Sequence, residues 1–468
     1  MRRVLSLIAF LFGLVLLVGC TGGEVDEDGL PTDGGSGPPA SAGGAFVKEG
    51  WFGGAGAPLH ARVQIKGVER RGDKSVLRYS VTSLDSSKKF LTFAVDLIDP
   101  VGRLLYRSTG STGGEEFAPG ATREMTAEFP AIPRSAAKVT AITRGTAGEF
   151  TGIPVTGPDD ASAASLARLR GNPVELYGIT EGEIKDAATS GQRVTVGLHT
   201  DALFEKTSAD LSGRAGAVLD ETARAIKAKA MGPLRFVGHT DSRGDDAANV
   251  ELSKERAEAV MREMKSRLGD GFSYSASGRG EAEPIAAEGG EDDAKARRRN
   301  RRVEITYEVK RPETPSPSAP ADFRPEDGEK VAGRSAKFGA AKRRLDVKPF
   351  YRDGAYIVAV FDIVNEGPGP TPPDTSYAHR DYPGGVFTAF SVRVPGSEDV
   401  YRTVRIGTVT PGATGSYVDP GRAVGGAEVN QPVRGFAYLP APPGNVTSVT
   451  FDAGPFGKFD EVPVARSQ

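Results

Sequence analysis

The chain of 468 residues is too long for a single hydrophobic core, so we expect several domains. Its 59 basic and 61 acidic residues give a net charge of -2, which argues against binding to nucleic acid, because a phosphate-facing surface needs a basic excess. The single cysteine excludes an internal disulfide bond and a cysteine-based metal site. The 60 glycine and 33 proline residues, with only 7% aromatic residues, are typical of strand-rich domains joined by linkers.

The first twenty residues have the pattern of a secretory signal. Arg2 and Arg3 precede an almost wholly apolar run, Val4 to Val18, which is shorter than the ~20 residues of a membrane-spanning helix. The run ends in Leu17-Val18-Gly19-Cys20, which resembles the bacterial lipobox. We therefore expect residues 1–20 to be a lipoprotein signal peptide, with Cys20 carrying fatty acyl chains such as palmitate. The alternative is an ordinary signal peptide in which Cys20 is incidental.

Two further segments show the pattern of β-sandwiches. Residues 21–58 are rich in Gly, Ser, Pro and acidic residues, and predict a flexible linker. Residues 59–157 contain short runs of alternating apolar and polar residues, which predict an antiparallel, Ig-like β-sandwich. Residues 310–332 predict a Pro-rich linker, and residues 333–468 a second sandwich that resembles a copy of the first. Neither sandwich shows a catalytic cluster, so both remain open as spacers or as modules that bind a protein partner.

Residues 173–309 follow a different pattern. Apolar runs at 193–198, 234–237, 272–276 and 302–308 predict four strands. Apolar positions at helical spacing, from Ala215 to Ile226 and from Ala257 to Leu268, predict two helices between them. We therefore predict a multidomain protein with a central α/β (α+β) domain, whose mixed sheet carries two main helices, between two β-sandwich domains.

One acid and one base in this central region are placed to act together. Asp241, in Gly238-His239-Thr240-Asp241, follows a predicted strand, and Arg256 lies at the edge of the buried stripe of the next helix. A carboxylate and a planar guanidinium suit a zwitterion that carries an ammonium beside a carboxylate. Two other interpretations remain open: Asp241 caps a turn, and Arg256 pairs with a glutamate or with Asp241.

An ordered set of motifs in the central region resembles the OmpA carboxyl-terminal family, which includes Pal-type lipoproteins and MotB-type stator proteins. The matching residues are Ser208–Leu211, Gly238–Asp241, Gly244, Asn249, Leu252-Ser253, Arg256-Ala257, Val260, Gly278, Gly280-Glu281, Pro284 and Asn300–Glu304. The resemblance implies a domain that binds peptidoglycan without cutting it and holds its diaminopimelate residue. It places the two principal ligand positions on Asp241 and Arg256, at the family's spacing of 15 residues, and further positions on Asn249 and Arg302. His199–Phe204 departs from the usual Phe-Asp run of the family, and residues 291–299 are more charged than is typical.

These features predict a lipoprotein that is anchored by Cys20 to a bacterial membrane, either the cell membrane or the outer membrane, outside the cytoplasm and facing the wall. It would tether that membrane to peptidoglycan. The alternative is a surface adhesin or partner-binding protein that uses its sandwiches and keeps the OmpA-like domain only as a wall anchor. We expect no enzyme, catalytic residue, cofactor or metal, because the four histidines are scattered and no catalytic motif is present. The basic run 297–302 lacks interleaved aromatic residues, so no nucleic-acid binding is expected.

Overall fold

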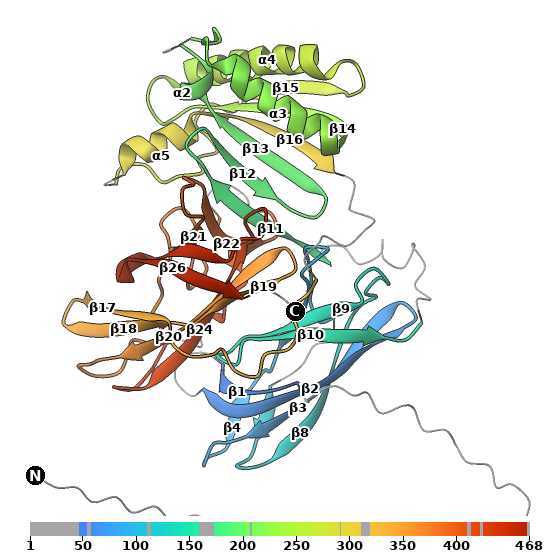
Figure 1. The fold of residues 1–468 in the computed structure, drawn as a ribbon, viewed down its shortest axis with the longest axis vertical. Coiled ribbons are helices and arrows are strands. Elements are labelled where there is room, and N and C mark those ends of the chain that lie inside the picture. Colours follow the sequence, from blue (N-terminus) through green and yellow to red (C-terminus); the bar gives the residue numbers. More distant parts are fainter. Residues whose placement is uncertain are drawn as a thin grey trace, which may run out of the picture. The chain divides into compact units, whose positions relative to one another are not determined.

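The computed structural model in Figure 1 describes residues 46–53, 58–109, 114–158, 173–205, 208–290, 292–309, 319–409, 413–421 and 425–465. All of them belong to one compact unit. The predicted signal peptide, with Cys20, lies outside the described residues, as do most of the predicted linker 21–58 and residues 310–318. Within the described ranges, none of the helices combines the length and the apolar character that crossing a membrane requires.

The N-terminal β-rich region consists of two antiparallel series of strands and one separate antiparallel pair of short strands. Its strands are β1 (Phe46–Phe52), β2 (Leu59–Arg71), β3 (Lys74–Ser83), β4 (Lys89–Leu91), β5 (Val95–Asp99), β6 (Leu104–Tyr106), β7 (Glu115–Phe117), β8 (Thr122–Pro130), β9 (Lys138–Thr143) and β10 (Glu149–Thr156). One series pairs β1, β2, β3 and β8 in that order, and the other pairs β10, β9, β5 and β6. Where the two series meet, β10 runs parallel to β2. Alternate residues of these strands are buried, which makes the core between the series.

The start of this region corrects one prediction. Phe46–Phe52 falls within the predicted flexible linker 21–58, but it forms β1 and pairs along its whole length with β2. The physical reason is that this segment carries two large aromatic residues on its two faces: Phe52 is buried in the core at 2% exposure, and the Trp51 ring stacks on His60 with centroids 4.5 Å apart.

The C-terminal β-rich region repeats the same connectivity. Its elements are β17 (Ala332–Phe338), β18 (Ala341–Val347), β19 (Phe350–Asp353), β20 (Tyr356–Asn365), β21 (Phe390–Arg393), β22 (Val400–Ile406), β23 (Ser416–Tyr417), β24 (Pro432–Pro440), β25 (Ser448–Ala453), the 3₁₀ turn η2 (Gly454–Phe456) and β26 (Lys458–Ala465). One series pairs β17, β18, β20 and β24, and the other pairs β26, β25, β21 and β22. The last strand again crosses over, because β26 runs parallel to β19. The two regions thus share the strand pairing that a duplication predicts.

The central region is a mixed sheet with helices. Its elements are β11 (Val174–Glu181), β12 (Lys185–Thr189), β13 (Arg193–His199), α2 (Thr200–Leu203), α3 (Ala215–Lys229), β14 (Ala230–His239), α4 (Asp246–Leu268), β15 (Tyr274–Gly278), α5 (Asp293–Asn300) and β16 (Arg302–Val309). The strand order is β15–β14–β16–β13–β12–β11, and only β15 and β14 are parallel. Apolar residues of α3 and α4 pack on one face of this sheet, with Leu219, Val260 and Ile305 fully buried. This arrangement confirms the predicted mixed α/β architecture.

Strand β11 connects all three regions. It pairs with β12 of the central sheet, with β22 of the C-terminal region and, through Val174 and Glu175, with β6 of the N-terminal region. The central sheet therefore continues without a break into a sheet of the C-terminal region. The sequence predicts separate domains for these regions, and this continuity is not among its predictions.

Part of the predicted Pro-rich linker is packed rather than extended in solvent. Among its described residues, the amide N–H of Ala321 donates to Asp353 Oδ1 at 3.0 Å, and Asp322 pairs with Lys138 at 3.1 Å. The Phe323 ring stacks on Phe150 with an interplanar angle of 7°. This segment therefore contacts both β-rich regions.

Candidate ligand-binding site

Three strands of the central sheet bring the candidate site together. His199 of β13 and His239 of β14 both lie opposite Arg302 at the start of β16. Since β16 is antiparallel to its two neighbours, the residues just beyond β13 and β14 meet the residue just before β16. Asp201, Arg301 and Asp241 therefore converge at one edge of the sheet.

Two glycines of the motif set how closely helix α4 approaches this edge. Gly238 and Gly278 are register partners at the ends of β14 and β15, and a Cβ on either would overlap the backbone of α4. Between them, the buried Ser253 hydroxyl accepts from the Gly280 amide at 3.0 Å and donates to the Val250 carbonyl at 2.8 Å. These contacts fix α4 beside the site.

Helix α4 begins at a capping aspartate and carries Arg256 to the site. The Asp245 side chain accepts a hydrogen bond from the Ala248 amide at 3.1 Å, which satisfies the first turn of the helix. Arg256 is 6% exposed, its Nε donates to the Ser208 carbonyl at 3.0 Å, and its guanidinium lies 5.4 Å from the centre of the Phe204 ring. Burial lowers the pKa of Arg256, the charge of Arg301 adds to that effect, and the carboxylates of the site oppose it.

Arg301 joins two carboxylates in this site. Its Nη1 lies 2.6 Å from Asp241 Oδ2, and its Nη2 and Nε lie 2.7 and 3.1 Å from the two carboxylate oxygens of Asp201. The hydrogen bond to Asp201 is the main reason why the pKa of Arg301 is raised. Together with Arg256 these residues form a cluster of two acids and two guanidinium groups with no net charge, which we call the four-charge cluster. Such a cluster can accept from an ammonium and donate to a carboxylate of the same ligand.

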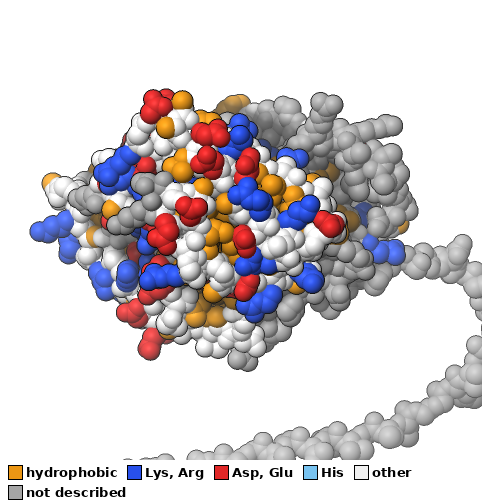
Figure 2. All heavy atoms as spheres, turned by 90° about the horizontal axis from the view of Figure 1, so that it is seen from above, with side chains coloured by type: hydrophobic (Ala, Val, Ile, Leu, Met, Phe, Trp, Pro, Cys, Tyr) orange, Lys and Arg blue, Asp and Glu red, His pale blue; other side chains and the backbone are white. Residues whose placement is uncertain are grey.

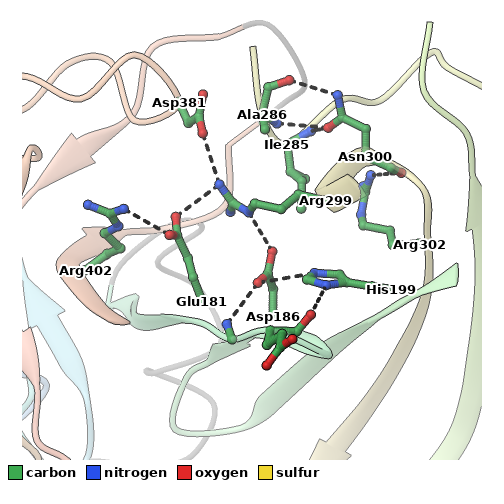
Figure 3. A network of polar contacts seen from close by, with 12 residues as sticks. Glu181, Asp186, His199, Ile285, Ala286, Arg299, Asn300, Arg302, Asp381 and Arg402 are labelled. Atoms are coloured by element: carbon green, nitrogen blue, oxygen red, sulfur yellow. Dashed lines mark hydrogen bonds and ion pairs between the residues drawn. The ribbon is translucent and has the colours of Figure 1, made fainter. Parts of the chain in front are cut away.

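Two asparagines of the motif support the loops around the cluster. Asn249 Nδ2 donates to the Arg243 carbonyl at 3.1 Å and to Glu281 Oε2 at 3.0 Å, which holds the loop between β14 and α4. Asn300 Oδ1 accepts from the amides of Ile285 and Ala286 at 2.9 and 3.0 Å, as Figure 3 shows. Both asparagines therefore order the loops that border the four-charge cluster.

Arg302, which the resemblance marked as a ligand position, is engaged elsewhere. Its Nε donates to Glu304 Oε1 at 2.8 Å, and its two Nη atoms donate to the carbonyls of Asn300 and Glu283 at 3.2 and 3.1 Å. It is 2% exposed and lines a cleft that Asp241 and Arg256 do not line. The structure thus places Arg256 near enough to Asp241 for the charge of Asp241 to act on the pKa of Arg256, and it is Arg301 rather than Arg302 that contacts Asp241.

His239 is buried behind the site. Its ring nitrogens have no hydrogen-bond partner among the described residues, and it is 1% exposed. Burial, reinforced by the charges of Arg302 and Arg279, lowers the pKa of His239 to about 2, so the ring is neutral. The neutral ring supports the strand end and adds no charge to the four-charge cluster.

Sequence reasoning missed Asp201 and Arg301. Asp201 lies in the run that departs from the family pattern, and Arg301 is adjacent to the residue that was selected. The start of β16 could have indicated Arg301. Arg301 comes just before the strand, whereas Arg302 is its first residue and follows the alternation of the strand.

The surface of the described residues carries charges of both signs. On the face shown in Figure 2, Lys and Arg side chains are interspersed with Asp and Glu side chains. Across the described part of the chain, no group of three or more His, Cys, Asp or Glu side chains is placed to hold a metal ion. The four-charge cluster is therefore balanced in charge, with two carboxylates and two guanidinium groups.

Comparison with known proteins identifies the family of this region. The sequence model of the OmpA family matches residues 203–299. The chain is 37% identical over 105 residues to the photosystem I P700 chlorophyll a apoprotein A2 of Gloeobacter violaceus, which covers 22% of this chain and 12% of that protein. It is 30% identical over 117 residues to the probable lipoprotein YiaD of Escherichia coli, which covers 25% of this chain and 52% of that protein.

A solved structure of the cell wall anchor of the T6SS from Pseudomonas aeruginosa is similar at 30% identity, with a TM-score of 0.25, over 27% of this chain and 90% of that one. The chain spans about half the length of the Escherichia coli relative and a smaller part of the photosystem protein. The resemblance read from the motifs is confirmed: residues 203–299 of this chain form a domain of the OmpA family.

Proposed function

We propose that this chain is a non-catalytic lipoprotein that ties a bacterial membrane to the cell wall by recognising the diaminopimelate of peptidoglycan. The OmpA family domain supports the wall-binding part of the proposal. The observation that carries it is the four-charge cluster, in which Asp241 and Arg256, selected from the sequence, lie beside Arg301 and Asp201.

The cluster fits the head group of diaminopimelate, which presents an ammonium beside a carboxylate. In the proposed complex the ammonium donates to Asp241 and Asp201, and the Arg256 guanidinium donates to the carboxylate. Asn249 holds the loop that carries Asp241, and Arg302 stays outside the site. Charge-assisted contacts of this kind contribute about 1.5–3 kcal/mol each when water is partly excluded.

Binding to the wall tests the site. We expect full-length protein to sediment with insoluble peptidoglycan, and Asp241→Asn or Arg256→Gln to weaken this binding at least about tenfold, the equivalent of one lost charged contact. The matched control is Arg262→Gln on the same helix. The Arg262 side chain is 67% exposed, and its ion pair with Glu258 is long, at 4.0 Å. Peptidoglycan that lacks diaminopimelate should bind weakly even to the parent protein. Equal sedimentation of the parent and both site variants would overturn the assignment.

Lipid attachment is proposed from residues 1–20 and from the similarity to the probable lipoprotein YiaD of Escherichia coli. The acylated protein would face the wall from outside the cytoplasm. We expect radiolabelled palmitate to be incorporated into the parent chain, and Cys20→Ser to abolish the label and move the protein to the soluble fraction, because the acyl chains supply the membrane affinity. A labelled Cys20→Ser protein would disprove attachment at this residue.

The two β-rich regions are proposed to be Ig-like antiparallel sandwiches. The support is that each pairs two antiparallel series of strands around a buried core and that both share one connectivity.

A further inference from the structure

Residues 285–290, which lie between β15 and α5, contact both the candidate site and the C-terminal β-rich region. The amide N–H of Ala287 donates to Asp381 Oδ1 at 2.9 Å, and the Arg380 guanidinium donates to the carbonyl of Glu288. Arg380 and Asp381 lie between β20 and β21 of the C-terminal region. Two hydrogen bonds from that region therefore hold the backbone of this segment, which we call the bridging loop.

The bridging loop reaches the candidate site through the side chain of Glu288. Its Oε2 accepts from the Ser242 hydroxyl at 2.6 Å, and its Oε1 accepts from Asn300 Nδ2 at 2.7 Å. The amide nitrogen of Ser242 also lies 3.4 Å from both oxygens of this carboxylate. Hydrogen bonds to a carboxylate are roughly twice as strong as those between neutral groups. Since Ser242 directly follows Asp241, Glu288 restrains the residue next to the carboxylate of the site.

Asp381 also acts on the site along a second path. Its Oδ2 accepts from Arg299 Nη1 at 3.0 Å, and Figure 3 shows the two side chains pointing toward each other. Arg299 belongs to α5, and Arg301, which follows the end of this helix, lies 2.6 Å from Asp241. One carboxylate of the C-terminal region thus contacts both segments that hold Asp241, the bridging loop and α5.

Ordering these segments before a ligand arrives favours binding. A mobile loop loses conformational freedom when it closes on a ligand, and that loss reduces the affinity. A side chain that contacts a ligand is most effective when neighbouring hydrogen bonds already hold it in place. In this chain part of that support comes from outside residues 203–299, the range that matches the OmpA family model.

We propose that Arg380 and Asp381 are positioning residues of the candidate site, through which the C-terminal β-rich region orders the loop that carries Asp241. Both act through the bridging loop and α5, and not by contact with the ligand. The effect on wall binding rests on the proposed function, whereas the ordering of the loop does not.

Hydrogen–deuterium exchange of the ligand-free, full-length protein in detergent tests the ordering. We expect Arg380→Ala and Asp381→Ala each to speed exchange of the amides in residues 240–245 about threefold or more, because one lost hydrogen bond changes an equilibrium about two- to twelvefold. After Arg380→Ala, exchange in β25, whose residues belong to the C-terminal core, should stay as in the parent. This comparison separates local loosening from a loss of overall stability.

Arg352→Ala is the matched control. Arg352 also donates to backbone carbonyls, those of Pro442 and Gly444 at 3.1 and 2.8 Å, but both belong to its own region. We expect this variant to leave the exchange of residues 240–245 and the binding to the wall unchanged. Because Arg380 is exposed, Arg380→Ala should fold even if Asp381→Ala does not.

Sedimentation with insoluble peptidoglycan tests the consequence for binding. We expect Arg380→Ala and Ser242→Ala each to weaken binding about threefold or more. Because both residues act through Glu288, the double variant should bind about as weakly as the weaker of the two single variants. Independent effects would instead multiply.

The inference is overturned if residues 240–245 exchange at the parent's rate in both Arg380→Ala and Asp381→Ala, or if the losses of wall binding multiply in the double variant. It falls alone if Asp241→Asn loses wall binding while Arg380→Ala and Asp381→Ala keep all of it. If the parent itself does not sediment with the wall, the proposed function fails, and the exchange rates alone decide the positioning role.

Discussion

At the scale of single residues, the candidate site depends on how Arg301 is shared. Asp241 already accepts from Arg301 at 2.6 Å, so an incoming ammonium would share this carboxylate rather than meet it unpaired. The second carboxylate, Asp201, keeps Arg301 in place through two contacts. A site whose charges are balanced before binding avoids the cost of holding a buried, unpaired charge in the free protein.

His239 gives a prediction at this scale. Its pKa is about 2 in the folded protein and ~6.5 in the unfolded chain, so only the unfolded chain takes up a proton below pH ~6.5. The free energy of unfolding should be unaffected by His239 above that pH and should decrease by up to ~1.4 kcal/mol per unit as the pH falls. We expect His239→Phe to remove this part of the slope between pH 6.5 and 5 in urea unfolding. An unchanged slope would show that the imidazole is not held neutral.

At the scale of elements, helix α5 links the candidate site to the C-terminal region. Its Arg299 donates to Asp186 at 2.9 Å, and a second nitrogen lies 3.0 Å from both Glu181 and Asp381 (Figure 3). Arg301, two residues later, contacts the carboxylates of the site. One short helix therefore fixes both the four-charge cluster and the boundary with β22.

Removing the Arg299 guanidinium, the central cation of this network of ion pairs, should destabilise the fold. We expect Arg299→Met to lower the free energy of unfolding by about 3–5 kcal/mol, because it leaves buried carboxylates with too little positive charge. Thermal or urea unfolding measures the loss. The matched control is Lys295→Met on the same helix, which is exposed and should change stability by no more than about 0.5 kcal/mol. Equal stability of both variants would contradict a structural role for the network.

Helix α5 also shows which features of the fold could not be predicted from the sequence. The strands around Val196 and Phe236 and the helices around Leu219 and Val260 were predictable, because their apolar residues repeat with the period of the element. Helix α5 has no apolar stripe: Ala296, Arg299 and Asn300 form its buried face. The partners of that face come from distant segments, and a local pattern does not reveal them. For the same reason Arg301 and Asp201 were missed although Asp241 and Arg256 were selected.

At the scale of the whole molecule, the two β-rich regions share an apolar interface. Side chains from both regions form one buried cluster, including Ile98 and Leu105 from the first and Tyr356, Val358 and Phe436 from the second. One pattern in the sequence indicates that a strand of the second region is covered on both faces. Residues Tyr356–Phe361 are all buried, and an unbroken apolar run indicates a strand covered on both faces rather than on one.

A buried ion pair across this interface gives a prediction with a pH signature. Glu149 of the first region accepts from Arg434 of the second at 2.6 Å and from the Tyr351 hydroxyl at 2.7 Å. Although burial alone would raise the pKa of Glu149, the charges of Arg434 and Lys48 hold it well below its usual range. The resulting stability is present above the unfolded pKa of ~4.3 and is lost as the pH falls below it.

We expect Glu149→Gln to lower the free energy of unfolding by about 2–4 kcal/mol at pH 7, since it leaves Arg434 with one buried carboxylate fewer. The difference between parent and variant should shrink as the pH is lowered from 5 towards 3, because below the unfolded pKa of ~4.3 the unfolded parent chain takes up a proton at Glu149 that the folded parent does not. Urea unfolding at several pH values measures both quantities. A difference that stays constant over this range would show that the carboxylate charge does not stabilise the interface.

The balance of charge in the four-charge cluster has a consequence for the environment in which the protein works. Screening by dissolved ions acts over about 8–10 Å at physiological ionic strength, whereas the contacts of this cluster span less than 3.2 Å. A cluster without net charge exerts no long-range attraction on a zwitterion, so dissolved salt has no such attraction to screen. Attachment of this kind would persist when a cell passes between dilute and saline surroundings.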